Sequence, residues 1–199
     1  MRIISGRARG LHLADVGAGD RAAHLRPTSD RVREAIFNIL AGGQDDPVTG
    51  ARVLDLFAGT GALGLEALSR GAARVAFVDD GAAARALLRE NIDRMRAMGE
   101  TDVWRRDATR LGERRGAPYG LVFLDPPYGQ GLGAKALQSA RRGGWLAPGA
   151  VVVWEENAPQ PALPGFQPRD QRRYGDTWVT FLNTPPGTED PADHGLADG

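Results

Sequence analysis

The chain has 199 residues, enough for one domain with a substantial core, and its formal charge is zero because 25 basic side chains balance 25 acidic ones. It contains no cysteine, which excludes disulfides, thiolate zinc sites and a cysteine nucleophile. No apolar run approaches the length of a membrane span, and the N-terminus lacks the apolar core of a signal peptide. We therefore expect a cytoplasmic protein with no membrane partner.

The charge is unevenly placed. Residues 184–199 contain four acids and no lysine or arginine, so the rest of the chain carries an excess of four positive charges. The proline, glycine and acid content of these residues predicts a disordered acidic tail. Nearly all basic residues are arginine, whose planar fork suits phosphate. Charge alone favours a nucleic-acid partner only weakly, because a codon bias would give the same composition.

The N-terminal 48 residues are predicted to form an extension in contact with RNA. Residues 1–13 alternate apolar and basic side chains around Gly6 and Gly10, which predicts a small β-hairpin. A helix is expected over residues 28–40, with Thr28 or Ser29 as its N-cap. Solvated side chains are the simpler interpretation of the arginines; a positive RNA-contacting surface is the other. The candidate RNA-binding residues are Arg7, Arg9, Arg26, Thr28, Arg31 and Arg33.

The stretch from Val53 to Gly64 predicts a buried strand, a tight glycine turn and the start of a helix. The remaining elements continue the alternation of strand and helix that is typical of a parallel sheet covered by helices. Strands are expected over 74–79, 102–106, 121–124 and 150–154, helices over 82–98 and 132–142, and a terminal hairpin over 166–174 and 178–182. Residues 49–183 thus form one catalytic domain.

Four features fall at the carboxyl ends of these strands, where open α/β sheets bind ligands. They are the glycine turn, Asp79, Asp107 and the sequence Asp125-Pro126-Pro127-Tyr128. Their convergence is the strongest physical argument that the sequence offers for a site.

Two cofactors compete for the glycine turn. Gly59-x-Gly61-x-x-Gly64, followed about twenty residues later by Asp79, fits the dinucleotide fingerprint of NAD or FAD enzymes. S-adenosylmethionine (AdoMet) is favoured instead by Asp55, a strand carboxylate that would suit a cationic amino acid and not a pyrophosphate. Asp107 is suited to accept a hydrogen bond from an adenine amino group.

The turn Asp125–Tyr128 has a clear role in methylating a planar nitrogen. An exocyclic base amino group is a poor nucleophile because its lone pair is delocalised into the ring. The Asp125 carboxylate and the Pro126 carbonyl would accept hydrogen bonds from its two N–H groups, in a loop stiffened by Pro126 and Pro127. Tyr128 offers a ring for the base to stack on. A tight strand exit without function is the alternative.

Several segments together resemble the RsmD family, bacterial methyltransferases that modify guanine N2 in small-subunit (16S) ribosomal RNA. The similar segments cover residues 1–183, and the first of them is the most specific. They are R-P-T-x-D-R-V-R-E-A-x-F-N (26–38), D-x-F-A-G-T-G-A-L-G-x-E-A (55–67), D-P-P-Y (125–128) and Y-G-D-T (174–177).

The resemblance implies an α/β, Rossmann-like class I AdoMet-dependent methyltransferase, with seven mostly parallel strands, an antiparallel last strand and an N-terminal hairpin-plus-helix extension. Asp125, Pro126, Pro127 and Tyr128 would be catalytic and bind guanine N2. The residues that would hold AdoMet are Asp55, Phe57, Ala58, Gly59, Thr60, Gly61, Asp79, Asp107 and Ala108.

These motifs predict methyl transfer to guanine N2 of ribosomal RNA, either free or in an assembling small subunit, by a monomer without a metal. Asp80 follows Asp79, so the sequence leaves open which of these two acids binds the ribose. Adenine N6 of nucleic acid and a protein glutamine amide remain alternative acceptors. An assembly factor with a vestigial AdoMet site is a further alternative, which the intact Asp125–Tyr128 turn disfavours.

Overall fold

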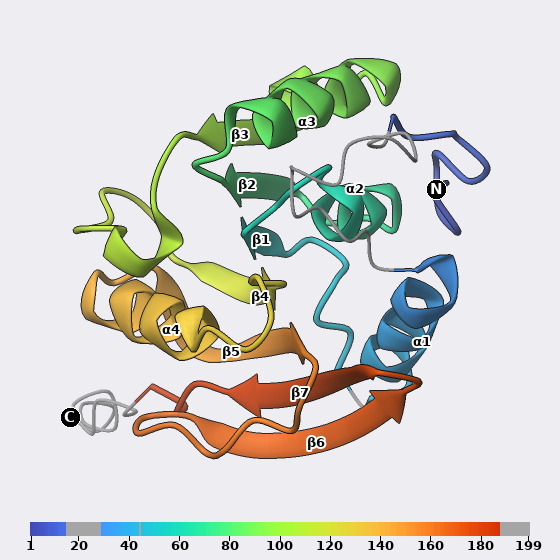
Figure 1. Cartoon of the computed structure of the whole chain (residues 1–199). Helices are drawn as coiled ribbons and strands as arrows, with labels where there is room; N and C mark the ends of the chain where they lie inside the picture. Colours follow the sequence, from blue (N-terminus) through green and yellow to red (C-terminus); the bar gives the residue numbers. More distant parts are fainter. Residues whose placement is uncertain (15–28, 44, 188–199) are drawn as a thin grey trace, which may run out of the picture.

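A seven-stranded sheet forms the centre of the computed structural model, which describes residues 1–14, 29–43 and 45–187 (Figure 1). The strands are β1 (Arg52–Leu56), β2 (Arg74–Val78), β3 (Thr101–Trp104), β4 (Tyr119–Leu124), β5 (Leu146–Glu156), β6 (Gln167–Tyr174) and β7 (Thr177–Asn183). The helices are α1 (Asp30–Ala41), α2 (Ala62–Ser69), α3 (Ala82–Arg94) and α4 (Leu132–Arg142), with short 3-10 turns η2 (Met98–Glu100) and η3 (Ala108–Arg110).

The strand order is β3-β2-β1-β4-β5-β7-β6. The first five strands pair in parallel, whereas β7 pairs antiparallel with both β5 and β6. The predicted seven-stranded, mostly parallel sheet with an antiparallel last strand is therefore confirmed. Since β1 and β4 lie side by side at the point where the strand order reverses, the expected ligand site lies at their carboxyl ends.

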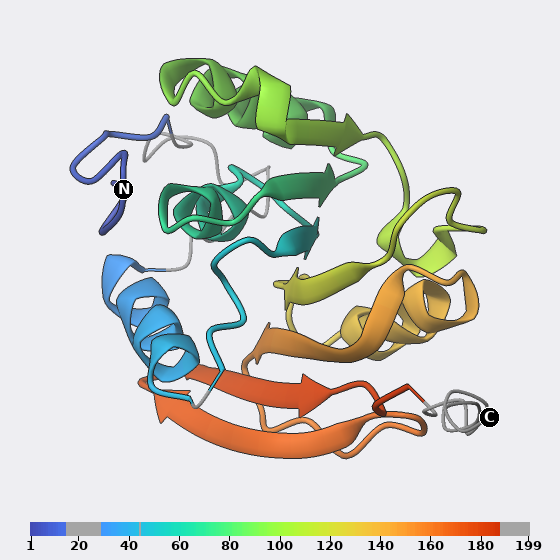
Figure 2. The same cartoon turned by 180° about the vertical axis from the view of Figure 1, so that it is seen from behind.

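Alternate residues of each central strand enter two separate apolar cores. Val53, Phe77 and Phe123 pack with α1, α2 and α3, whereas Leu54, Val78 and Leu124 pack with α4 and the segment around η3. The two opposite views show these helices on the two faces of the sheet (Figure 1 and Figure 2). Burial on both faces explains why the central strands read as continuous apolar runs.

The predicted hairpin at residues 1–13 is reduced in the structure to one antiparallel bridge, between Arg2 and His12. The segment folds back on itself but rests against the catalytic domain. Gly6 has φ +81°, and a Cβ there would lie 1.8 Å from the Ser69 carbonyl oxygen, so the backbones approach too closely for any other residue.

Other boundaries differ from prediction for local reasons. The helix expected over 82–98 ends at Arg94, because Arg96 adopts a left-handed conformation (φ +55°) and η2 follows. Two residues of the predicted tail, Thr184 and Pro185, hydrogen-bond to Ala150 and Gly149 of β5. The rest of the predicted tail lies outside the described residues. No described helix has the length and apolarity needed to cross a membrane.

Candidate active site

The glycine turn leaves β1 through a strained backbone. Phe57 has φ +56°, which is unusual for a residue with a side chain and turns the chain sharply out of the strand. The Ala58 N–H then donates to the Val78 carbonyl (3.1 Å) and the Gly61 N–H to the Ala58 carbonyl (2.7 Å). A Cβ on Gly61 would lie 2.3 Å from Leu88 of α3, so the turn is held tightly against that helix.

Asp79, at the end of β2, is bound to this turn. One carboxylate oxygen accepts from the Gly59 N–H (2.9 Å) and the other from the Gly81 N–H (2.8 Å). Its pKa is raised, chiefly because it is largely buried. Asp80 is exposed, so of the two neighbouring acids Asp79 is the one the structure joins to the turn.

Asp55 is a buried acid at the centre of the site. Its side chain is 2% exposed, and one oxygen accepts from the Gly64 N–H in the first turn of α2 (2.9 Å). Burial raises its pKa well above the ordinary value, and the nearby carboxylates of Asp125 and Asp79 raise it further. Three carboxyl groups from β1, β2 and β4 therefore share one region of negative potential.

Asp107 forms the N-cap of η3, directly after β3. One oxygen accepts from the Thr109 N–H (2.8 Å) and hydroxyl (2.7 Å), and these bonds lower its pKa. Asp107 is exposed and stays ionised, whereas the next residue, Ala108, is buried. The structure thus places an acceptor at the end of β3, on the edge where Asp79 and Asp55 also lie.

The turn Asp125–Tyr128 begins beside the end of β1, because the Asp125 N–H donates to the Leu56 carbonyl (3.4 Å). Pro126 is buried, whereas Asp125 and Tyr128 are half-buried. The turn thus leaves β4 adjacent to the strand that leads into the glycine turn. The two motifs, 70 residues apart in the sequence, thus lie beside each other at one edge of the sheet.

Glu156 holds the far end of this turn. Its carboxylate accepts from the N–H groups of Gly129 (3.2 Å) and Asn157 (3.1 Å), and its side chain is buried. This residue was not singled out for a role from the sequence. An acid at the end of a predicted strand was the available signal, and only the tertiary contact with Gly129 gives it a role.

The N-terminal arginines lie differently from one another. Arg9 and Arg31 are exposed, as an RNA contact requires, and Arg7 forms an exposed ion pair with Glu100. Arg26 and Thr28 lie outside the described residues. Arg33 is fully buried, so the expectation that its side chain contacts RNA does not fit the structure.

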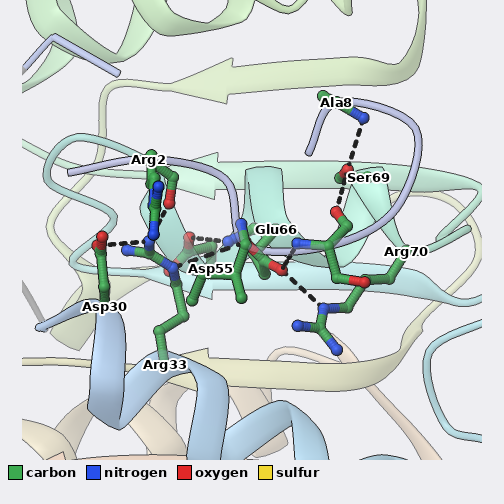
Figure 3. A network of polar contacts seen from close by, with 11 residues as sticks. Arg2, Ala8, Asp30, Arg33, Asp55, Glu66, Ser69 and Arg70 are labelled. Atoms are coloured by element: carbon green, nitrogen blue, oxygen red, sulfur yellow. Dashed lines mark hydrogen bonds and ion pairs between the residues drawn. The ribbon is translucent and has the colours of Figure 1, made fainter. Parts of the chain in front are cut away.

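Arg33 is buried because it belongs to a polar network centred on Glu66 of α2 (Figure 3). The Glu66 carboxylate accepts from the backbone N–H groups of Ile4 (2.8 Å) and Ser5 (3.0 Å) and from the Arg70 guanidinium (2.7 Å). The Arg33 Nε lies 3.7 Å from the same carboxylate. The network attaches both the N-terminal segment and α1 to the helix that follows the glycine turn.

Asn91 of α3 forms a second attachment. Its side-chain amide donates to the carbonyls of Thr60 (2.9 Å) and Ala14 (3.0 Å), and its oxygen accepts from the Ala14 N–H. A fully buried amide thereby connects the glycine turn to the N-terminal segment. Nothing in its sequence context marks Asn91, because its partners come from distant parts of the chain.

Comparisons with known proteins agree with this arrangement. Residues 1–183 match the family described as "Conserved hypothetical protein 95". The chain is 39% identical over 155 residues to Ribosomal RNA small subunit methyltransferase D of Escherichia coli K12, covering 78% of this chain and 74% of the relative. It is 40% identical over 131 residues to the putative rRNA methyltransferase YlbH of Bacillus subtilis, covering 64% and 67%.

A solved structure, described as the putative methyltransferase yhhF from Escherichia coli, superposes with a TM-score of 0.78 at 32% identity. The superposition covers 94% of this chain and 99% of that one. The expected Rossmann-like methyltransferase fold is confirmed. With a matched family over most of its length and close relatives in sequence and structure, the chain belongs to the family of ribosomal RNA small subunit methyltransferase D.

Proposed function

We propose that this protein transfers a methyl group from AdoMet to the exocyclic N2 of a guanine in small-subunit ribosomal RNA. The observation that carries the proposal is the juxtaposition of Asp125–Tyr128 with the glycine turn at the ends of β4 and β1. The name of the Escherichia coli relative, which refers to small-subunit ribosomal RNA, and that of the Bacillus subtilis relative, which refers to rRNA, support the acceptor. In this proposal the protein acts in the cytoplasm as a monomer, on ribosomal RNA or an assembling subunit.

The acids of the site fit AdoMet better than a dinucleotide. AdoMet carries a sulfonium and an ammonium group, whereas NAD and FAD carry an anionic pyrophosphate. Burial and the neighbouring Asp125 and Asp79 carboxylates raise the pKa of Asp55, and a cationic ligand would offset this cost of ionising it. We assign Asp55, Phe57 and the Ala58–Gly61 turn to the methionine moiety, Asp79 to the ribose, and Asp107 with Ala108 to the adenine.

AdoMet, when bound, supplies an electrophilic methyl group on a sulfonium that leaves as a neutral thioether. In the proposed reaction the Asp125 carboxylate and the Pro126 carbonyl accept hydrogen bonds from the two N–H groups of the guanine amino group. This favours pyramidalisation and directs the nitrogen lone pair outwards. Tyr128 stacks on the base, and the product proton passes to Asp125 or to water. Glu156 keeps the turn in position through Gly129.

The affinity for AdoMet should increase with pH. The raised pKa of Asp55 means that a proton is held at low pH, and a cation bound beside the carboxylate favours its loss. Binding should therefore release protons. Below the raised pKa, affinity should fall by up to about tenfold per pH unit for one linked proton.

Calorimetric titrations between pH 5 and 8, in two buffers of different protonation enthalpy, would measure this release. Asp55→Asn, which cannot ionise, should bind more weakly at pH 8 and with a flatter pH profile. Equal proton release by both proteins, or none by either, would contradict the role of Asp55.

The acceptor is tested by incubating the protein with labelled AdoMet and, separately, small ribosomal subunits, bare ribosomal RNA, DNA and release-factor protein. The modified nucleoside or residue is then identified. Label in N2-methylguanosine is expected. Label in N6-methyladenine or in a glutamine amide would replace guanine by one of the two alternative acceptors. Absence of label from every RNA would end the proposal.

A further inference from the structure

We infer that the segment between β3 and β4, on the sheet face opposite the N-terminal extension, binds the phosphate backbone of the RNA substrate. Six residues form this arginine surface: Arg52, Arg105, Arg106, Arg110, Arg114 and Arg115. The inference rests on the proposed function for the identity of the nucleic acid. Five of the six belong to the connection between β3 and β4, which is drawn in yellow-green beside α4 (Figure 1), and Arg52 is the first residue of β1.

Charge is concentrated here although the whole chain is neutral. The eleven residues 105–115 contain five arginines and two acids. Arg105 and Arg115 are exposed, and the Arg110 side chain is 87% exposed. Asp102 is the nearby acid on β3, and Arg74 already binds both of its oxygens (2.8 and 2.9 Å). Within the segment, Arg110 forms an ion pair with Asp107 at 4.0 Å. With Asp107 and Glu113 as its two acids, the segment keeps an excess of three positive charges.

Three guanidinium groups are held close together by aromatic rings. Arg114 lies over Tyr119 (5.0 Å), Trp145 (5.2 Å) and Trp104 (5.8 Å). Arg52 lies over Tyr119 as well, at 5.3 Å, and Arg106 lies over Trp104 at 4.9 Å. Stacking on a ring offsets part of the repulsion between neighbouring cations and holds their planes in fixed orientations.

The segment is rigidly attached to the fold. The Arg114 N–H donates to the Gly143 carbonyl (2.7 Å), the Trp145 indole to the Gly112 carbonyl (2.8 Å), and the Leu111 N–H to the Ser139 hydroxyl (2.9 Å). Preorganised arginines lose little conformational entropy when they bind a ligand, so less of the binding free energy is lost when they contact the phosphates of an RNA backbone.

The chemistry and the position favour RNA. The surface begins two residues before Asp107, at the edge of the candidate active site, so one strand of RNA could contact both. An anionic membrane is the other class of partner for an arginine-rich surface. Membrane-surface segments usually add apolar side chains. Among the described residues, however, the exposed large hydrophobic side chain is Met98, which lies outside this surface.

The test removes two exposed charges without touching the aromatic rings. R105Q/R115Q should weaken binding of a labelled ribosomal RNA hairpin about tenfold at low salt. The slope of log affinity against log salt should fall by roughly 0.7–0.9 for each phosphate that the variant no longer neutralises. AdoMet affinity should stay within twofold. R89Q/R96Q, which removes two exposed arginines near α3, is the matched control and should bind RNA as the wild type does.

Equal weakening in the two double variants, or in neither, would overturn the inference, because the charge would then act only through the net charge of the protein or not at all. Loss of binding to phosphatidylserine vesicles with unchanged RNA binding would assign the surface to a membrane and overturn it as well. RNA binding is read directly. A wild-type protein that transfers no methyl group therefore contradicts the proposed function and leaves this comparison intact.

Discussion

Asp125→Ala is expected to slow methyl transfer by a factor of about a hundred or more while leaving AdoMet affinity within about threefold of wild type. The substitution removes the carboxylate proposed to accept an N–H bond of the target amino group. It leaves Asp79 and the glycine turn unchanged. Loss of one preorganised transition-state interaction typically lowers kcat by 10² to 10³-fold. Single-turnover transfer of labelled methyl, with cofactor binding by calorimetry, measures the two effects separately.

Asp79→Ala is the matched control, because the same chemical change is made to another acid of the site. It should raise the dissociation constant for AdoMet, since Asp79 accepts from the Gly59 and Gly81 N–H groups at the proposed ribose site. Saturating cofactor should then restore much of the rate. The assignment of Asp125 to the guanine would be wrong if the Asp125 variant transferred methyl normally, or if AdoMet rescued it equally well.

Glu66→Ala should lower the free energy of unfolding by about 3–5 kcal/mol, a loss typical of breaking a buried ion pair. Glu66 and Arg33 are both fully buried. The substitution removes the acceptor of the Ile4 and Ser5 N–H groups and of Arg70, and it leaves Arg33 with the half-exposed Asp30 (2.9 Å) as its remaining carboxylate partner. In a chain of this size the melting temperature should fall by about 10 °C. Denaturant and thermal unfolding measure both quantities.

Glu90→Ala provides the comparison, because Glu90 forms an exposed ion pair with Arg94 one helical turn away (2.6 Å). Such pairs contribute less than about 1 kcal/mol. A double variant, Glu66→Leu with Arg33→Met, should recover part of the loss, because it also removes a buried charge that would keep only the half-exposed Asp30 as a carboxylate partner. Equal destabilisation by Glu66→Ala and Glu90→Ala would show that the buried network contributes no more to the free energy of unfolding than an exposed ion pair does.

Local sequence patterns were sufficient to predict most strands and helices of the catalytic domain. Strands β1, β2 and β4 are short apolar runs bounded by glycine, proline or acid, and each lies within two residues of its prediction. The bounds of α4 agree fully, because Gly143 and Gly144 end it. The end of α3 was wrong by several residues, because the left-handed conformation of Arg96 depends on packing that the helical pattern does not contain.

The RNA-contacting residues were harder to predict, because an arginine in a sequence does not reveal its partner. Arg33 and Arg31 were both candidate RNA-binding residues, yet Arg33 points inward to Glu66, a residue of another helix. The arginines of residues 105–115 were not singled out. Two of them, Arg106 and Arg114, are brought together by three aromatic residues, Trp104, Tyr119 and Trp145, that come from separate parts of the chain.

The sequence by itself determined the order of strands and helices, the motifs at the strand ends and the chemistry they suit. These depend on residues close together in the chain, where apolar periodicity, glycine and proline act directly on the backbone. Only the tertiary structure decided that Asp55, Asp79 and Asp125 share one electrostatic field, that Glu156 supports the Asp125–Tyr128 turn, and that Arg33 is internal. Each of these depends on contacts between residues that are far apart in the sequence. Burial and electrostatic interactions arise from such contacts and are therefore set by the folded structure.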